Sequence, residues 1–132
     1  MFNFIRGLEN LMGNEYLSRN QYLVDPSQTF ELLLDYNCNL AVYNYAHSYY
    51  DNPYWQTGTR ADNCFLMMQL DCNLVLYDGY GRAIWNSDTD SDNGNRPCYF
   101  TMQSDRNIVV YSQDTREALW SAGIWLGRDD DD

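Results

Sequence analysis

The chain has 132 residues, of which 45% are hydrophobic and 16% aromatic, so it can bury the core of one domain. Nineteen acidic residues face eight basic ones, all arginines, and leave a formal net charge of −11 at pH 7. Such a surface repels phosphate groups, so we expect no nucleic acid partner, and a neutral ligand is favoured. No stretch approaches the roughly 20 apolar residues that span a bilayer, so we expect no membrane insertion.

Residues 1–13 are predicted to be an N-terminal extension. Ile5, Leu8 and Leu11 fall at helical spacing, which favours a short helix there. This helix would dock on a partner subunit or anchor at a membrane surface, and a single arginine makes the anchor the weaker alternative. The extension lacks the apolar run and cleavage site of a secretory signal, so we expect a mature chain or export by another route.

One alternating pattern of polar and apolar residues occurs three times. It ends each time in a tyrosine, at Tyr43, Tyr77 and Tyr111, which are 34 residues apart. The copies read Asp35-x-Asn37-x-Asn39-x-Ala41-x-Tyr43, Gln69-x-Asp71-x-Asn73-x-Val75-x-Tyr77 and Gln103-x-Asp105-x-Asn107-x-Val109-x-Tyr111. The chain is therefore one structural unit repeated three times.

Each copy predicts a hairpin. The incoming strands are predicted over 30–34, 65–69 and 99–103, and the outgoing strands over 39–43, 73–77 and 107–111. Short polar turns join them at Asn37-Cys38, Asp71-Cys72 and Asp105-Arg106. In the outgoing strand Leu74 and Leu76 share one face, which buries, and the motif side chains share the other.

A tryptophan follows each hairpin, at Trp55, Trp85 and Trp120. Three large aromatic side chains in equivalent positions of three repeats predict a shared central core.

Four cysteines stand at positions 38, 64, 72 and 98, so the gaps between them are 26, 8 and 26 residues. None of these gaps matches the short cysteine pairs of zinc sites. Equal gaps in a repeat protein favour two equivalent disulfides, Cys38 with Cys64 and Cys72 with Cys98. The alternative is four reduced cysteines in a cytosolic protein.

The motif is similar to the Q-x-D-x-N-x-V-x-Y signature of the monocot mannose-binding lectins, also called bulb-type or B-type lectins, over residues 14–126. This resemblance implies an all-β fold, the β-prism II, in which three four-stranded antiparallel sheets surround a pseudo-threefold axis. It implies one tryptophan per repeat at the centre and a family disulfide at Cys38 and Cys64. The pairing of Cys72 with Cys98 would be its repeat-shifted copy.

In that family the glutamine, aspartate, asparagine and tyrosine of one motif hydrogen-bond a single mannose, and the valine contacts its ring carbons. The resemblance therefore implies sugar sites made of Gln69, Asp71, Asn73, Val75 and Tyr77, and of Gln103, Asp105, Asn107, Val109 and Tyr111. The side-chain types suit a hexose, which needs fixed donors and acceptors beside a small apolar contact. The alternative is that the polar residues only form turns.

The first copy is degenerate, with Asp35, Asn37, Asn39 and Tyr43 as its polar residues and Ala41 in place of valine. It lacks the amide, the carboxylate and the valine methyl groups at their family positions. We expect sugar binding there to be weak or absent.

The sequence thus predicts a non-enzymatic lectin for α-D-mannose or mannose-ended glycans, with no cofactor. The alternative is a protein-interaction or toxin module, similar to bacteriocins, with vestigial sugar sites. No opposed carboxylate pair indicates a glycosidase, and His47, the only histidine, has no nucleophile motif beside it. We expect no metal site, because Asn93 stands where a calcium loop beginning at Asp88 requires glycine.

The segment from Trp120 to Leu126 is apolar, and residues 127–132 are predicted to be a solvated acidic tail. In relatives the C-terminal strand enters a neighbouring subunit's sheet, so the resemblance implies a homodimer, and an unpaired edge strand would favour one. We expect a secreted or extracellular protein, in mucus or another secretion, with a cytoplasmic location as the alternative.

Overall fold

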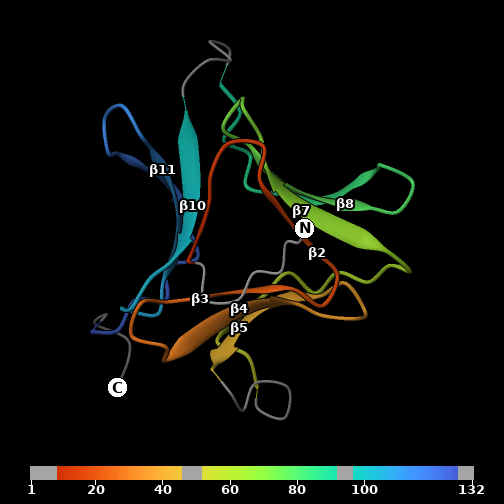
Figure 1. Ribbon diagram of the computed structural model, residues 1–132, viewed down its shortest axis with the longest axis horizontal. Helices are drawn as coiled ribbons and strands as arrows, with labels where there is room; N and C mark the ends of the chain where they lie inside the picture. Colours follow the sequence, from red (N-terminus) through yellow and green to blue (C-terminus); the bar gives the residue numbers. More distant parts are fainter. Residues whose placement is uncertain (1–8, 46–51, 92–96, 128–132) are drawn as a thin grey trace.

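The computed structural model describes residues 9–45, 52–91 and 97–127, and in these ranges it contains three four-stranded antiparallel sheets. The sheets stand around a common axis like the faces of a triangular prism (Figure 1). This arrangement confirms the predicted β-prism II fold. The predictions that concern His47, Asn93 and residues 128–132 fall outside the described residues.

Each sheet combines one repeat with one strand from the start of the chain. The order in sheet C is β3 (Tyr22–Val24), β4 (Phe30–Leu34), β5 (Leu40–Asn44) and β6 (Trp55–Gln56). In sheet B it is β2 (Tyr16–Ser18), β7 (Cys64–Met68), β8 (Leu74–Asp78) and β9 (Ala83–Asn86). In sheet A it is β1 (Asn10–Leu11), β10 (Cys98–Met102), β11 (Ile108–Ser112) and β12 (Ala118–Ser121).

The predicted strands agree with β4, β5, β7, β8, β10 and β11 to within one residue at each end. The turns between them are longer than predicted. Strand β4 ends at Leu34 and β5 begins at Leu40, so residues 35–39 form the connection, and the other repeats match. Its fourth residue takes a left-handed backbone, with φ of 71° at Cys38, 74° at Cys72 and 81° at Arg106. This bend closes the loop around the motif aspartate.

The helix predicted over 1–13 is wrong where the structure describes that segment. Asn10 and Leu11 form β1, which pairs with Thr101 and Phe100 of β10. Leu11 is only 2% exposed and belongs to the core. A strand forms here because it completes sheet A as its fourth strand. Its pairing partners are distant in the sequence, so the local spacing of apolar residues does not reveal them. The domain therefore includes residues that we assigned to the extension.

The core lies inside the prism and consists of the inward faces of all three sheets. Leu74 and Leu76 are fully buried there, as the alternation predicts. The indole rings of Trp55, Trp85 and Trp120 meet edge to face, with ring centroids 5.4 to 5.8 Å apart. This near-threefold cluster confirms the predicted central aromatic core.

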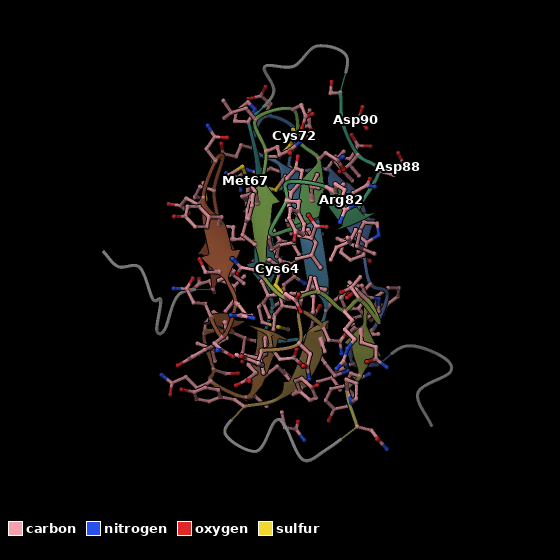
Figure 2. All side chains as sticks on the ribbon, turned by 90° about the vertical axis from the view of Figure 1, so that its right-hand side faces the viewer. Cys64, Met67, Cys72, Arg82, Asp88 and Asp90 are labelled. Carbon is pink, nitrogen blue, oxygen red and sulfur yellow. A yellow bond between two sulfur atoms is a disulfide. The ribbon has the colours of Figure 1, made fainter. Side chains whose placement is uncertain are left out.

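Both predicted disulfides are present, Cys38–Cys64 and Cys72–Cys98. Each joins the turn of one repeat to the first strand of the next. Cys64 and Cys72 lie towards opposite ends of sheet B, so one bridge ties it to sheet C and the other to sheet A (Figure 2).

The C-terminal segment stays on its own chain. Strand β12 pairs with β11, and beyond it the amides of Ala122 and Leu126 donate to the carbonyls of Ile108 and Asp105. Sheet A thus obtains its four strands from one chain, with β12 as an edge strand. A homodimer stays a prediction.

Candidate functional site

The motif of repeat two lies on the loop between β7 and β8 and on the outward face of β8. Asp71 organises this loop through one carboxylate oxygen. Its Oδ1 accepts hydrogen bonds from the Asn73 backbone N–H and from Nε2 of Gln69, both at 3.0 Å. The backbone N–H of Gln69 donates to the backbone carbonyl of Asn73 at 3.0 Å and closes the hairpin. The loop therefore holds the glutamine and the aspartate in fixed relative positions.

Tyr77 completes the frame. Its hydroxyl donates to Oε1 of Gln69, which fixes the orientation of the glutamine amide. The ring of Tyr77 stacks on Phe65 across the strand pair, with centroids 5.1 Å apart. Val75 lies between the loop and the tyrosine along the strand and is almost fully buried.

Repeat three reproduces this frame. Oδ1 of Asp105 accepts from the Asn107 backbone N–H at 2.9 Å and from Nε2 of Gln103 at 3.0 Å. The Tyr111 hydroxyl donates to Oε1 of Gln103 at 2.6 Å, and its ring stacks on Tyr99 at 5.4 Å. The structure thus brings together both complete sets of predicted site residues.

The motif asparagine is a structural anchor as well as a site residue. Oδ1 of Asn73 accepts from the Thr89 backbone N–H at 3.2 Å, and Oδ1 of Asn107 accepts from the Ile124 N–H at 3.2 Å. Each bond holds the segment that follows the third strand of the repeat. The asparagine carbonyl is therefore committed to the fold.

The remaining polar atoms of each frame suit a hydroxylated ligand. In the described residues, Oδ2 of Asp71 and of Asp105 has no hydrogen-bond partner, and neither has Nδ2 of Asn73 or of Asn107. A carboxylate oxygen accepts from hydroxyls, an amide nitrogen donates to them, and a tyrosine oxygen can also accept. Two neighbouring sheets each present this set of donors and acceptors.

Tyr111 keeps its proton at neutral pH. Burial raises the pKa of its hydroxyl, and the nearby Tyr99 and Asp105 raise it further, while the hydrogen bond to Gln103 acts in the opposite direction. The tyrosine therefore remains a donor to the glutamine over the ordinary pH range.

Repeat one is built differently. Oδ1 of Asp35 accepts from the backbone N–H groups of Asn37 and Asn39 at 2.9 and 3.0 Å, so the carboxylate stands where the other repeats have glutamine. Nδ2 of Asn39 donates to Oε1 of Gln56 at 2.8 Å, which uses one of its two N–H donors. The asparagine amide of repeat one is therefore held by Gln56, whereas Nδ2 of Asn73 and of Asn107 has no partner in the described residues.

The sheet face beside the first motif is also closed. Tyr43 is only 8% exposed and packs with Leu33 and Ala41, while Tyr22 covers them. Burial raises the pKa of Tyr43, with smaller contributions from the charges of Asp35 and Glu31. This apolar cluster occupies the face on which the other sheets carry their sites.

Sequence reasoning missed the aromatic residues opposite the motif tyrosines. Phe65 and Tyr99 support the rings of Tyr77 and Tyr111, whereas repeat one has Glu31 opposite Tyr43. A signal was present: an aromatic residue stands four positions before the glutamine in both complete copies and is absent from the degenerate one. In the three described ranges, no group of three or more histidine, cysteine or acidic side chains could hold a metal ion. No helix in those ranges is long and apolar enough to cross a membrane.

Solved structures resemble this chain closely. A lectin from Gastrodia elata, described as a monomeric monocot mannose-binding lectin, shares 31% identity over 89% of this chain and 99% of its own, with a TM-score of 0.76. The mannose-specific snowdrop agglutinin, solved with methyl-α-D-mannoside, shares 33% over 90% of this chain and 99% of its own, with a TM-score of 0.70. A lectin from Marasmius oreades shares 25% identity over 92% of this chain and 97% of its own, with a TM-score of 0.77. No family model matches the chain, and no curated protein matches it.

Three sheets around one axis, two of them carrying the same polar frame, define a carbohydrate-binding lectin. The neighbours are lectins, a class that binds sugars without transforming them. The chain belongs to the bulb-type family of monocot mannose-binding lectins.

Proposed function

We propose that this lectin binds α-D-mannose or mannose-ended glycans through repeats two and three. The observation that carries the proposal is the duplicated frame, in which one oxygen of Asp71 or Asp105 orders the loop and the other has no partner among the described residues. The snowdrop agglutinin is mannose-specific and the Gastrodia lectin is mannose-binding, which supports the choice of sugar.

The site atoms match a hexose with several hydroxyls on one side. The carboxylate accepts charge-assisted hydrogen bonds, and the asparagine and glutamine amides donate. Val75 or Val109, each 3% exposed, provides a small apolar floor beneath the ring carbons. Each site uses five side chains on one open sheet face, so we infer that a single site binds weakly.

We also propose that two copies of the chain act together, because linked weak sites give useful avidity. A homodimer would present four intact sites, and its mass in solution by light scattering would show it. Two disulfides favour an oxidising compartment, so we propose a secreted protein. Cysteines found alkylatable in the protein from its native source would contradict this.

Retention on immobilised mannose tests the sugar proposal. We expect the protein to be retained and to be released by methyl α-mannoside but not by galactose. The Asp71→Ala, Asp105→Ala double variant should pass through the column. Asp114→Ala, which removes one carboxylate from the exposed β11–β12 turn, is the control and should still bind. Folded wild-type protein that is not retained, or a double variant that is, would overturn the proposal.

A further inference from the structure

A groove of about 830 Å³ opens where sheets B and C meet. No residue of either intact motif lines it. Its walls come from separate parts of the chain: Arg19 follows β2, Arg60 follows β6, and Tyr80 and Arg82 belong to the β8–β9 turn. Tyr36 and Asn37 of the first-repeat turn complete it. Arg82 is visible on the side of sheet B in Figure 2.

The charge of the groove opposes that of the chain. Three of the eight arginines line it, together with two aspartates, so the lining carries a net +1 while the chain carries −11. One of these aspartates is committed to the fold. The carboxylate of Asp78 accepts from the backbone N–H groups of Tyr80 and Arg82, each at 2.9 Å, and from Nε of Arg82 at 3.1 Å. The hydrogen bond from the Arg82 backbone is the largest influence on the pKa of Asp78, which is lowered.

Much of the donor capacity of the arginines remains available. Arg82 uses Nε for Asp78, and Arg19 uses Nη1 for the carbonyl of Asp62. Arg60 is exposed, and its guanidinium has no hydrogen-bond or ion-pair partner in the described residues. A guanidinium that keeps a pair of N–H groups can take a carboxylate in a bidentate fashion.

The groove also presents aromatic faces. Tyr36 and Tyr80 are 63% and 86% exposed, the two highest values among the exposed large hydrophobic side chains of the described residues. Arg19 lies over the ring of Tyr36, with its guanidinium carbon 4.4 Å from the centroid, and Arg82 lies 5.3 Å from that of Tyr80. Stacking orders both the arginines and the rings before any ligand arrives.

We propose that this groove is a second binding site, for a pyranose that carries a carboxylate. The guanidinium groups of Arg60 and Arg82 bind the carboxylate, the rings of Tyr36 and Tyr80 pack against the sugar ring, and the amides of Asn37 and Asn63 take hydroxyls. A neutral hexose would not require a cluster of arginines, which an acidic chain without lysine gathers here. The inference goes beyond the proposed function, because it uses none of the mannose-site residues.

The test is a titration of the isotopically labelled full chain, followed by amide chemical shifts, with methyl β-D-glucuronide and with its neutral counterpart methyl β-D-glucoside. We expect the glucuronide to shift amides at 60–63 and 79–82 saturably, and the glucoside to leave them unchanged. N-acetylneuraminic acid, run separately, distinguishes a sialic acid from a uronic acid as the preferred source of the carboxylate.

Variants connect the response to the groove. Arg60→Gln, and Arg60→Gln with Arg82→Gln, should weaken glucuronide binding by about tenfold or more, the size expected for loss of charge-assisted hydrogen bonds. Arg116→Gln makes the same change of charge on the distant β11–β12 turn and should bind as wild type. Because the guanidinium of Arg60 has no hydrogen-bond or ion-pair partner to lose within residues 9–45, 52–91 and 97–127, its single variant tests the site even if the double variant unfolds.

The amide chemical shifts of the proposed mannose sites are measured in the same samples. Methyl α-mannoside should shift amides at 69–77 and 103–111, and the Asp71→Ala, Asp105→Ala variant should lose that response while keeping the glucuronide response. The groove proposal is overturned if wild type shows no saturable glucuronide shifts, if the glucoside binds equally well, or if glucuronide binding disappears with the mannose sites. Failure of the mannoside alone would overturn only the proposed function.

Discussion

The guanidinium of Arg106 lies over the ring of Tyr54, 4.6 Å from its centroid, at the corner where sheet A meets sheet C. Arg106 occupies the turn position that holds Cys38 and Cys72 in the other repeats. Phe30, which occupies the strand position of Cys64 and Cys98, packs edge to face on Tyr54 at 6.0 Å. Disulfides thus close two corners of the prism, and the stacked side chains of Arg106, Tyr54 and Phe30 close the third.

Removing either side of this contact should destabilise the fold. We expect a double-mutant cycle of Arg106→Ala and Tyr54→Ala to give a coupling energy of about 0.5–1 kcal/mol, the size of a partly exposed cation–π contact. Urea unfolding of the four proteins measures it. Arg106→Lys keeps the charge but stacks less well, so it should recover only part of the stability. Strictly additive single changes would show that the corner holds without this pair.

Reducing the disulfides should weaken the fold more. Each bridge joins cysteines 26 residues apart, for which chain entropy predicts a contribution of about 3.5 kcal/mol. We expect Cys72→Ser with Cys98→Ser to lower the free energy of unfolding by roughly 2–5 kcal/mol. Cys38→Ser with Cys64→Ser should give a comparable loss, because the bridges are equivalent by repeat. Denaturant unfolding without a reductant compares the two variants, and equal stability to wild type would contradict the prediction.

Stability should fall in acid through Asp25. This side chain is 1% exposed, and its carboxylate accepts hydrogen bonds from Ser27, Thr29, Phe30 and Ser104. Burial alone would raise the pKa of Asp25, but these hydrogen bonds outweigh it and lower the pKa from 3.8 to about 2. The charged form is thus favoured in the folded state, and its contribution of about 2 kcal/mol is present above pH 3.8.

That contribution is lost as the pH falls through about 2, where the folded state also takes up the proton. Unfolding free energies measured between pH 5 and 2 should show a decline that is much smaller in Asp25→Asn, which titrates no proton at this position. Parallel pH profiles for the two proteins would contradict the assignment.

The three tryptophans should matter for stability and not directly for sugar binding. Trp85→Ala removes one ring from the cluster with Trp55 and Trp120, and we expect a loss of about 3–5 kcal/mol. Mannoside affinity, measured where the variant is still folded, should match wild type because Trp85 lies in the core and the motifs face outward. A loss of affinity in the folded variant would show that the core also controls the sites.

The motif asparagines should affect both properties. Asn107 is buried and accepts the amide of Ile124, so Asn107→Ala removes a structural bond as well as a sugar donor. We expect roughly 1–3 kcal/mol of destabilisation together with weaker mannoside binding. Gln103→Ala, whose contacts lie in the open site, should weaken binding with a smaller loss of stability. Thermal unfolding and mannoside titration of the two variants, taken together, check this difference.

Much of the fold could be predicted because the same strand–turn–strand pattern occurs three times in the sequence. The strands around Asn73 and Asn107 alternate with period two, so their limits and buried faces follow from local chemistry, and the cysteine spacing indicates both bridges. Strand β1 was missed because Leu8 and Leu11 also fit a helix. Only the distant residues Phe100 and Thr101 decide in favour of a strand.

The residues of the candidate sites could be predicted, but not which of their atoms hold the fold and which are left for a ligand. The motif does not reveal that one oxygen of Asp71 holds the loop while the other has no partner in the part of the chain that the structure describes. Nor does it reveal that Asn107 anchors the C-terminal segment. The groove had no sequence signal at all. Arg19, Arg60 and Arg82 lie in three unrelated connections, and only the folded sheets bring them together.

The way in which the first 24 residues supply all three sheets has a consequence for the order of folding. Strand β1 pairs with Thr101, β2 with Phe65 to Met67, and β3 with Glu31 to Leu33. The earlier one of these strands lies in the chain, the later its partner is synthesised. Sheet C can form soon after synthesis begins, whereas sheet A needs residues 91 positions apart to meet. Because such long loops are closed late, we infer that the prism assembles from sheet C towards sheet A. A ribosome that stalled before residue 98 would leave β1 as an unpaired edge, open to strands of other chains.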